Sequence, residues 1–260
     1  TNQPFFSGAG FVGTGASVAT IARRYDGFLG DQLRQTNSDA ADLTTYLDQM
    51  QRLSNLLGDP AAGLAPALSG FFEAVQAVSA QPSDMSSRQA MLSSAQALTS
   101  RLRSFDAQLQ SMREAANRSI RSSVSGINSL TQQIAVLNDR ISRLTGIGSS
   151  AQQPNDLLDQ REALVMELNR EIGASAVQGN DGSYNIFLSS GQAVVLGTSA
   201  YALTAGVDSE DPADVQVSMA VGAGQMRLRP EDLSGGRLGG YLGFRREGLT
   251  WTLVEGDFLA

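Results

Sequence analysis

The longest regular pattern in the sequence is a hydrophobic stripe between residues 88 and 145. Apolar side chains recur there every ~3.5 residues without an intervening proline, the spacing of a helix that faces a partner helix along its length. The stripe consists of Leu102, Phe105, Leu109, Met112, Ala116, Ile120, Val124, Ile127, Leu130, Ile134, Leu137, Ile141 and Leu144. A helix of this extent is about 85 Å long, whereas helices in globular cores average about 11–12 residues. The pattern therefore predicts an elongated molecule with long coiled-coil-like helices.

Shorter helices precede this rod. Helical spacing from Ser17 to Leu57 predicts one helix, with Ser17 as its N-cap and Gly58-Asp59-Pro60 as its stop. Apolar positions between Leu64 and Val78 predict a second helix, which ends at Gln81-Pro82 because the residue before a proline disfavours helical geometry.

Capping residues mark the start of the rod and the limits of one more helix. Ser83 or Asp84 can cap the rod, and the last helix begins at Pro154-Asn155-Asp156 and stops at Gly173. Long stripes are buried only when helices pack side by side, so these elements predict an elongated antiparallel helical bundle.

The hydrophobic period changes to two after the last helix. Gly179-Asn180-Asp181-Gly182 is a hairpin turn signal between two alternating segments, Ser175 to Gln178 and Tyr184 to Leu188. Further strands are predicted at Ala193 to Leu196, Tyr201 to Thr204, Val215 to Val221, and around Met226 and Leu228. We expect a small antiparallel β subdomain of short strands, with the acidic segment 208–214 as a solvent-exposed loop.

A glycine-rich segment follows the strands. If Ser234 caps a helix, then Gly236, Gly239, Gly240 and Gly243 share one face without side chains, which lets another backbone approach closely. Each glycine costs ~1 kcal/mol of helix propensity relative to alanine, so four on one face indicate a packing requirement. A phosphate-binding loop is the alternative, but the sequence lacks the lysine that this motif needs.

These elements give a fold that is mainly α with a small β module. We expect four segments: an elongated helical rod domain with an extended N-terminal segment at 1–172, the β subdomain at 173–232, a glycine-faced helix returning to the rod at 233–249, and an unassigned tail at 250–260. Because the sequence starts at Thr1 rather than Met, it is expected to be a piece of a longer chain.

Three missing residue types exclude much chemistry. The sequence has no His, no Cys and no Lys, so a Ser-His-Asp triad, a thiolate nucleophile, an ordinary zinc site and a Schiff base are ruled out. Asp139, Asp159, Glu162 and Glu167 occupy helical positions where a solvated face is the simpler interpretation. We therefore predict a non-enzyme without catalytic, cofactor-binding or metal-binding residues.

Charge and hydropathy exclude two further classes of partner. The net charge of −7 disfavours nucleic-acid binding, which needs clustered cations. The sequence has no run of eighteen apolar residues, so no membrane-spanning segment is expected. Gly8-Ala9-Gly10-Phe11-Val12-Gly13 matches a dinucleotide-binding fingerprint, but a long helix without a following strand replaces the βαβ unit that this fingerprint requires.

Four blocks of sequence, in this order, resemble the flagellar hook-associated protein 1 (FlgK) family. They are GAGFVGTGASVATIARRYDGFLGDQLR at 8–34, PNDLLDQREAL at 154–164, GQAVVLG at 191–197 and LSGGRLGGYLGFR at 233–245. The resemblance implies an extracellular structural component of the bacterial flagellum, exported through the flagellar type III apparatus and assembled at the hook–filament junction. It also implies that this sequence lacks both terminal helices of the family.

The resemblance further implies partners. These would be other copies of the chain, the hook protein, the second hook-associated protein, and an export chaperone that binds a region absent here. Tube-forming subunits need long lateral surfaces, and head-to-tail contacts generate open helical assemblies. Candidate subunit contacts are Phe5, Phe6, Phe11, Arg23 and Arg34; the alternative is that these residues only cover the bundle.

Other interpretations remain open at this point. Another axial protein, such as the second hook-associated protein or a flagellin, would share the long helices but not all four blocks. An elongated helical sensor or binding module would need membrane spans, and an enzyme would need opposed carboxylates in a cleft.

Overall fold

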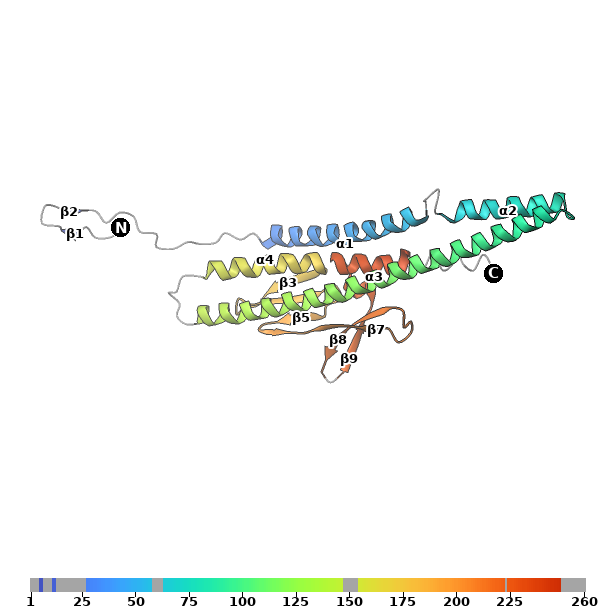
Figure 1. Cartoon of the computed structure of the whole chain (residues 1–260). Helices are drawn as coiled ribbons and strands as arrows, with labels where there is room; N and C mark the ends of the chain where they lie inside the picture. The colour runs from blue at the N-terminus through green and yellow to red at the C-terminus, as the bar shows by residue number, and fades with distance from the viewer. Residues whose placement is uncertain are drawn as a thin grey trace.

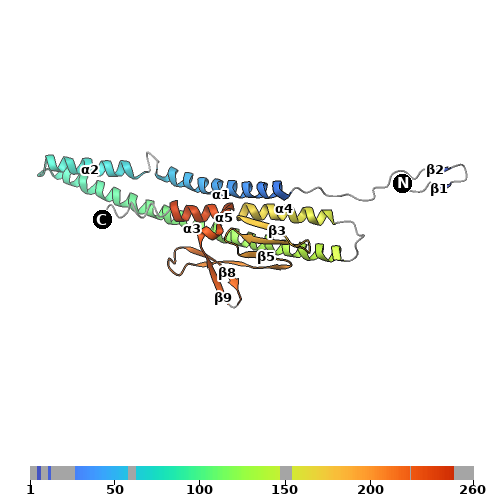
Figure 2. The ribbon, with the colours of Figure 1, turned by 180° about the vertical axis from the view of Figure 1, so that it is seen from behind.

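A computed structural model describes residues 27–57, 63–146, 154–222 and 224–248, together with the backbone of residues 5–6 and 11–12. The molecule is elongated, and the axes of its long helices lie roughly along its long dimension (Figures 1 and 2). The helices are α1 (Gly27–Leu57), α2 (Leu64–Ala80), α3 (Met85–Gly146), α4 (Asn155–Glu171) and α5 (Gly236–Gly243), with a 3-10 turn η1 (Pro230–Leu233) and a π-helical turn η2 (Phe244–Gly248).

Helix α3 confirms the predicted rod, because its 62 residues form one unbroken helix. Of the two predicted caps, the structure uses Asp84, whose carboxylate accepts hydrogen bonds from the backbone N–H groups of Ser86 (3.3 Å) and Ser87 (2.9 Å). A third bond, from the Ser87 hydroxyl, contributes most to holding the pKa of Asp84 below its usual value, and the two backbone bonds add to it. An acidic cap at this position also matches the positive end of the helix dipole.

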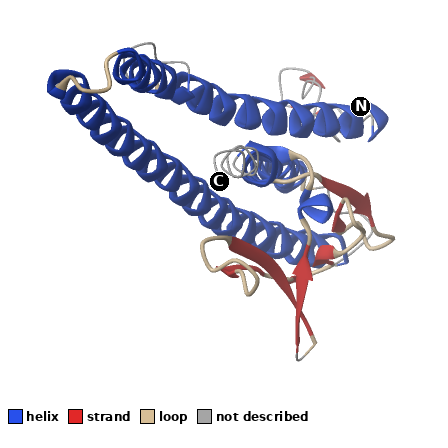
Figure 3. Ribbon diagram, turned by 90° about the vertical axis from the view of Figure 1, so that its right-hand side faces the viewer, coloured by secondary structure: helices blue, strands red, loops and turns tan. Residues whose placement is uncertain are grey.

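The helices form an antiparallel arrangement with α4 and α5 in the middle. Helix α2 turns back into α3, and α4 and α5 lie end to end between α1 and α3 (Figures 1 and 3). The stripe on α3 is buried between Ala116 and Ile141, where it contacts α4, α5 and the strands, but Leu102 and Leu144 at its two ends are exposed. The stripe therefore does not face one partner helix along its whole length.

The predicted antiparallel β subdomain forms, and its strands are divided between two sheets. One has the strand order β3 (Ala174–Gln178), β4 (Tyr184–Leu188), β5 (Ala193–Leu196) and β6 (Ser199–Ala200). The other has the order β7 (Leu203–Val207), β8 (Val215–Val221) and β9 (Gly224–Leu228). The predicted strand at Tyr201 to Thr204 is wrong in its bounds, because the chain changes sheet between Ala200 and Leu203.

The glycine-faced helix forms, but Ser234 does not cap it. Ser234 follows η1, and its hydroxyl bonds that of Ser189 at 3.1 Å. Gly235 and Gly236 start the helix with positive φ angles of 83° and 66°, a backbone conformation that glycine adopts without strain. The prediction of close backbone approach is confirmed, because a Cβ atom on Gly240 would lie 2.5 Å from the carbonyl oxygen of Asp42 in α1.

Several predicted features lie outside the described residues. They are the Ser17 cap, the stop at Gly58-Asp59-Pro60, the G-x-G-x-x-G segment as a whole, Arg23 and the tail after Gly248. Of the N-terminal segment the structure describes two short strands, β1 (Phe5–Phe6) and β2 (Phe11–Val12), which pair antiparallel.

Candidate assembly surface

Helix α1 carries most of its leucines on the outside of the molecule. Leu29, Leu33, Leu43, Leu47 and Leu57 follow one another at alternating intervals of four and ten residues, which keeps them on one side of the helix and matches a heptad repeat, and we call this set the α1 seam. Leu43 and Leu47 at its centre are 62% and 61% exposed. In a soluble protein an extended apolar stripe of this kind marks a surface that another element covers.

The opposite, buried face of α1 is polar from Arg34 to Thr45, whereas Tyr46, Met50 and Leu53 pack into an apolar cluster near the end of the helix. Its inward residues are Arg34, Ser38, Thr45 and Leu53, and the first three of these side chains are polar. An amphipathic helix normally buries its apolar face. Because the exposed leucines of α1 lie on the side away from α4 and α5, its contact with these helices leaves an apolar face available to a further partner.

An ion pair and a hydrogen-bond network hold α1 in this orientation. The Arg34 guanidinium pairs with Glu162 of α4 and with Asp31 one turn away on α1. Glu162 also accepts a hydrogen bond from the Tyr184 hydroxyl at 3.2 Å, which ties β4 to the same point. Glu162 therefore belongs to a partly buried network, and its interpretation as part of a solvated face is wrong.

A second contact fixes α1 against the glycine segment. One carboxylate oxygen of Asp42 accepts a hydrogen bond from the Gly235 N–H at 3.0 Å. Burial raises the pKa of Asp42 above its ordinary value, and the bond from Gly235 opposes this rise. Side chains at Gly239 or Gly240 would collide with α1, so these glycines set the distance between α1 and α5.

The α2–α3 hairpin presents additional apolar surface. Helix α2 has no fully buried residue, and Leu68, Phe72 and Leu92 are exposed on the two helices of the hairpin. Phe72 is 60% exposed and lies beside Phe71, with the two ring centroids 5.7 Å apart. The apolar surface of the rod is thus not confined to α1.

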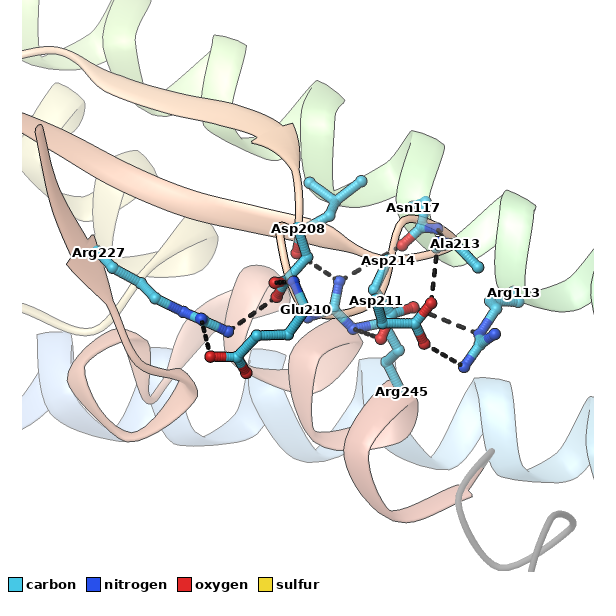
Figure 4. Close-up of polar contacts among 10 residues, drawn as sticks. Arg113, Asn117, Asp208, Glu210, Asp211, Ala213, Asp214, Arg227 and Arg245 are labelled. Atoms are coloured by element: carbon cyan, nitrogen blue, oxygen red, sulfur yellow. Dashed lines mark hydrogen bonds and ion pairs between the residues drawn. The ribbon is translucent and has the colours of Figure 1, made fainter.

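The acidic segment 208–214 is not a simple solvated loop, because its carboxylates form ion pairs with arginines of other elements (Figure 4). We call this segment with its arginine partners the acidic clasp. Arg113 of α3 pairs with Asp211 (3.2 Å) and Asp214 (3.3 Å), and the largely buried Arg245 of η2 lies 3.6 Å from Asp214. At the other end of the segment, Arg227 of β9 pairs with Asp208 at 2.8 Å. The ion pairs of Arg113 and Arg245 attach the β7–β9 sheet to α3 and η2, whereas the Arg227 pair lies within the sheet region. The solvent-exposure interpretation misses the first group because Arg113 and Arg245 are distant in sequence from the acidic segment.

A polar groove lies beside the central helices, and some of the polar side chains that line it are paired with one another. This groove, of about 430 Å³, runs along Ser119, Ser123 and Gly126 of α3 towards Glu171 and Arg237. Glu171 is already bonded to the Ser123 hydroxyl (3.0 Å) and to Arg237 (2.8 Å). Within the described ranges, no group of three or more acidic side chains is placed to hold a metal ion.

Of the five predicted contact residues, the structure describes the side chain of Arg34 alone. Arg34 is buried and paired inside the chain, so its charge already has an internal role. Phe5, Phe6 and Phe11 are described by their backbone alone, and Arg23 lies outside the described residues. The α1 seam was not among the predicted contacts, although its heptad spacing could have indicated it.

No described helix is both long and apolar enough to cross a membrane. A rod of antiparallel helices with an exposed leucine seam is typical of an elongated structural protein. Sequence comparison identifies its family. The chain belongs to the FlgK family, since residues 50–260 match the model of the flagellar hook-associated protein FlgK helical domain.

Curated relatives support this assignment. The chain is 38% identical over 244 residues to flagellar hook-associated protein 1 of Salmonella typhimurium, a match covering 94% of this chain and 44% of that protein. It is 37% identical over 244 residues to the protein of the same name from Escherichia coli. The chain thus spans less than half the length of these relatives.

A solved structure agrees with the fold. The flagellar hook junction protein FlgK from Burkholderia pseudomallei superposes with a TM-score of 0.76 at 35% identity, covering 83% of this chain and 39% of that one. The mainly helical fold with small antiparallel sheets is confirmed. The family consists of structural flagellar proteins, so the non-enzyme prediction is confirmed for the family.

Proposed function

We propose that the chain is part of a structural component of the hook–filament junction, outside the cell, where it enables filament assembly and motility. The observation that carries the proposal is the match of 94% of the chain to hook-associated protein 1. An elongated rod with a long uncovered apolar face is the kind of body that a tubular assembly requires. Other copies of the chain, the hook protein and the second hook-associated protein are its proposed partners.

We further propose that the α1 seam is a packing surface of the full-length protein. The matched relatives are more than twice as long as the match, and a heptad seam pairs with another helix, so the covering element we propose is a helix from the remainder of such a longer polypeptide. Intramolecular pairing gives this helix a high effective concentration. Phe5, Phe6, Phe11 and Arg23 are kept as proposed subunit contacts outside this seam.

A deletion experiment tests the proposed function. Removing the full-length gene should leave cells with hooks but without filaments, and flagellin should accumulate in the medium. Electron microscopy of the cells and immunoblotting of the medium measure both effects. Restoration by the full-length gene is the control, and normal filaments in the deletion strain would reject the proposal.

A further inference from the structure

Three asparagine side chains on α3 form hydrogen bonds with the backbone of the β region. Asn117, Asn128 and Asn138 follow one another at intervals of eleven and ten residues. These intervals equal about three turns of a helix with ~3.6 residues per turn, so the three side chains share one face, spaced ~15 Å apart. Each contacts the β region within two residues of the end of a strand.

Asn128 has the most specific geometry of the three. Its Nδ2 donates to the Leu203 carbonyl at 2.8 Å, and its Oδ1 accepts from the Leu203 N–H at 2.8 Å. A side-chain amide thus offers Leu203 the same donor and acceptor that a neighbouring strand would offer. Leu203 is the first residue of β7, at the point where the chain leaves one sheet and enters the other.

Asn138 is fully buried and uses both ends of its amide. Its Nδ2 donates to the carbonyls of Tyr184 (2.8 Å) and Gly197 (2.6 Å), and its Oδ1 accepts from the Tyr184 N–H (3.0 Å) and Arg161 (2.9 Å). Tyr184 begins β4, and Gly197 lies in the turn between β5 and β6. One side chain therefore fixes two separate points of the first sheet.

Asn117 completes the row at the acidic clasp. Its Nδ2 donates to the Ala213 carbonyl at 2.7 Å, just before β8, and its Oδ1 lies 3.4 Å from the Arg245 guanidinium that donates to it. The hydrogen bonds of the three asparagines therefore reach the first sheet, the crossover between the sheets and the second sheet, all from one continuous helix.

We propose that Asn117, Asn128 and Asn138 are positioning residues that fix the orientation of both sheets on the rod. Apolar packing of Ile120, Val124 and Ile127 holds the sheets against α3, but such packing is not directional. Hydrogen bonds to strand backbones define direction and register. Helix α3 thus transmits the orientation of the rod to the sheets, an inference independent of where the protein assembles.

Spin-label distances in the Asn128→Leu variant test this proposal directly. The parent chain has no cysteine, so no other residue can take up a thiol-reactive spin label. Arg121→Cys on α3 and Gln225→Cys on β9 place the two labels at exposed positions. Pulsed electron resonance should give a narrow distance distribution in the parent. In the Asn128→Leu variant the distribution should become at least about twice as wide, and the Leu203 amide should exchange roughly tenfold faster.

Two controls separate orientation from general loss of structure. Gln133→Leu makes a similar polar-to-apolar change at an exposed position of α3 and should leave the distribution unchanged. A label pair at Arg121→Cys and Gln160→Cys reports α3 against α4 and should stay narrow in every variant.

A second variant covers the case in which the β7–β9 sheet of the Asn128→Leu protein unfolds. Asn128→Asp keeps the acceptor for the Leu203 N–H but removes the donor to its carbonyl, and it should give an intermediate width. A parent-like distribution in a folded Asn128→Leu protein whose Leu203 amide exchanges freely would overturn the proposal. If Asn128→Leu unfolds the sheet, a parent-like distribution for Asn128→Asp would also overturn it.

Discussion

Gly240 of α5 lies so close to Asp42 of α1 that a Cβ atom at this position would be 2.5 Å from the Asp42 carbonyl oxygen. The added Cβ atom would also lie 2.8 Å from the Cβ atom of Thr45. Backbone and side-chain atoms of α1 therefore both leave no room for a side chain at position 240. The two helices can therefore touch only because this residue has no side chain.

The first prediction concerns Gly240→Ala, which should destabilise the fold by about 1–3 kcal/mol because α1 and α5 must move apart. Gly126→Ala on α3 is the matched control. Its Cβ would meet nothing within 4 Å, so alanine should stabilise the helix by ~0.5–1 kcal/mol. Urea denaturation measures both values, and equal effects of the two substitutions would contradict the close-approach argument.

Local patterns were sufficient to predict most of the helices and this glycine contact. The stripe on α3, the Asp84 cap and the turn at Gly179 to Gly182 all lie within a few residues of the elements they define. Such signals depend on backbone geometry and burial of a single face, so they can be recognised in the sequence.

Long-range polar contacts could not be predicted in the same way. Arg34 and Glu162 are 128 residues apart, and nothing in either segment indicates that one partly buried pair joins them. The split into two sheets escaped prediction for a similar reason, since Asn128 contacts Leu203 across 75 residues. The domain boundaries at 173, 233 and 250 stay predictions.

The second prediction concerns pH. Burial raises the pKa of Asp42, so the folded protein binds this proton more tightly than the unfolded chain does. The ionised carboxylate therefore opposes folding above the raised pKa, and this penalty disappears as the pH falls to the ordinary value of about 3.8. Asp42→Asn should gain stability relative to the parent at neutral pH, and the gain should shrink on acidification.

Asp232→Asn provides the opposite case. Bonds from the Arg229 backbone and side chain lower the pKa of Asp232, so this carboxylate stabilises the fold above the unfolded-state pKa and loses that contribution as the pH falls. Denaturation curves recorded from neutral pH down to about pH 3, below the unfolded-state pKa, should show the two variants changing in opposite directions relative to the parent. Parallel changes would be inconsistent with the assigned causes.

The third prediction concerns the buried Arg161. Its guanidinium lies 3.8 Å from the centre of the Tyr184 ring and donates to the Asn138 side chain (2.9 Å) and to the Gly182 carbonyl (2.8 Å). Arg161→Leu removes these charge-assisted bonds and should cost ~2–4 kcal/mol of unfolding free energy. Arg140→Leu, at an exposed position of α3, should change stability by less than ~0.5 kcal/mol.

Arg161→Lys distinguishes geometry from charge. Lysine keeps the positive charge, but its single ammonium group cannot reproduce the planar guanidinium contacts with an amide, a carbonyl and a ring. We expect it to recover less than half of the stability lost in Arg161→Leu. Full recovery would mean that charge alone, rather than the planar group, stabilises this point.

The final prediction separates folding from assembly at the α1 seam. Leu43 and Leu47 are more than half exposed, so the double substitution Leu43→Gln, Leu47→Gln should change the unfolding free energy of the 260-residue chain by less than ~0.5 kcal/mol. In the full-length protein the same change removes apolar contacts from the proposed helix pairing. A deletion strain complemented with the double variant should therefore lose motility, which would report a defect in assembly. Thr44→Gln, at an exposed position of the same helix, is the control and should keep motility. Full motility with the double variant would show that the seam is not a packing surface, because two buried polar side chains would weaken a helix pair.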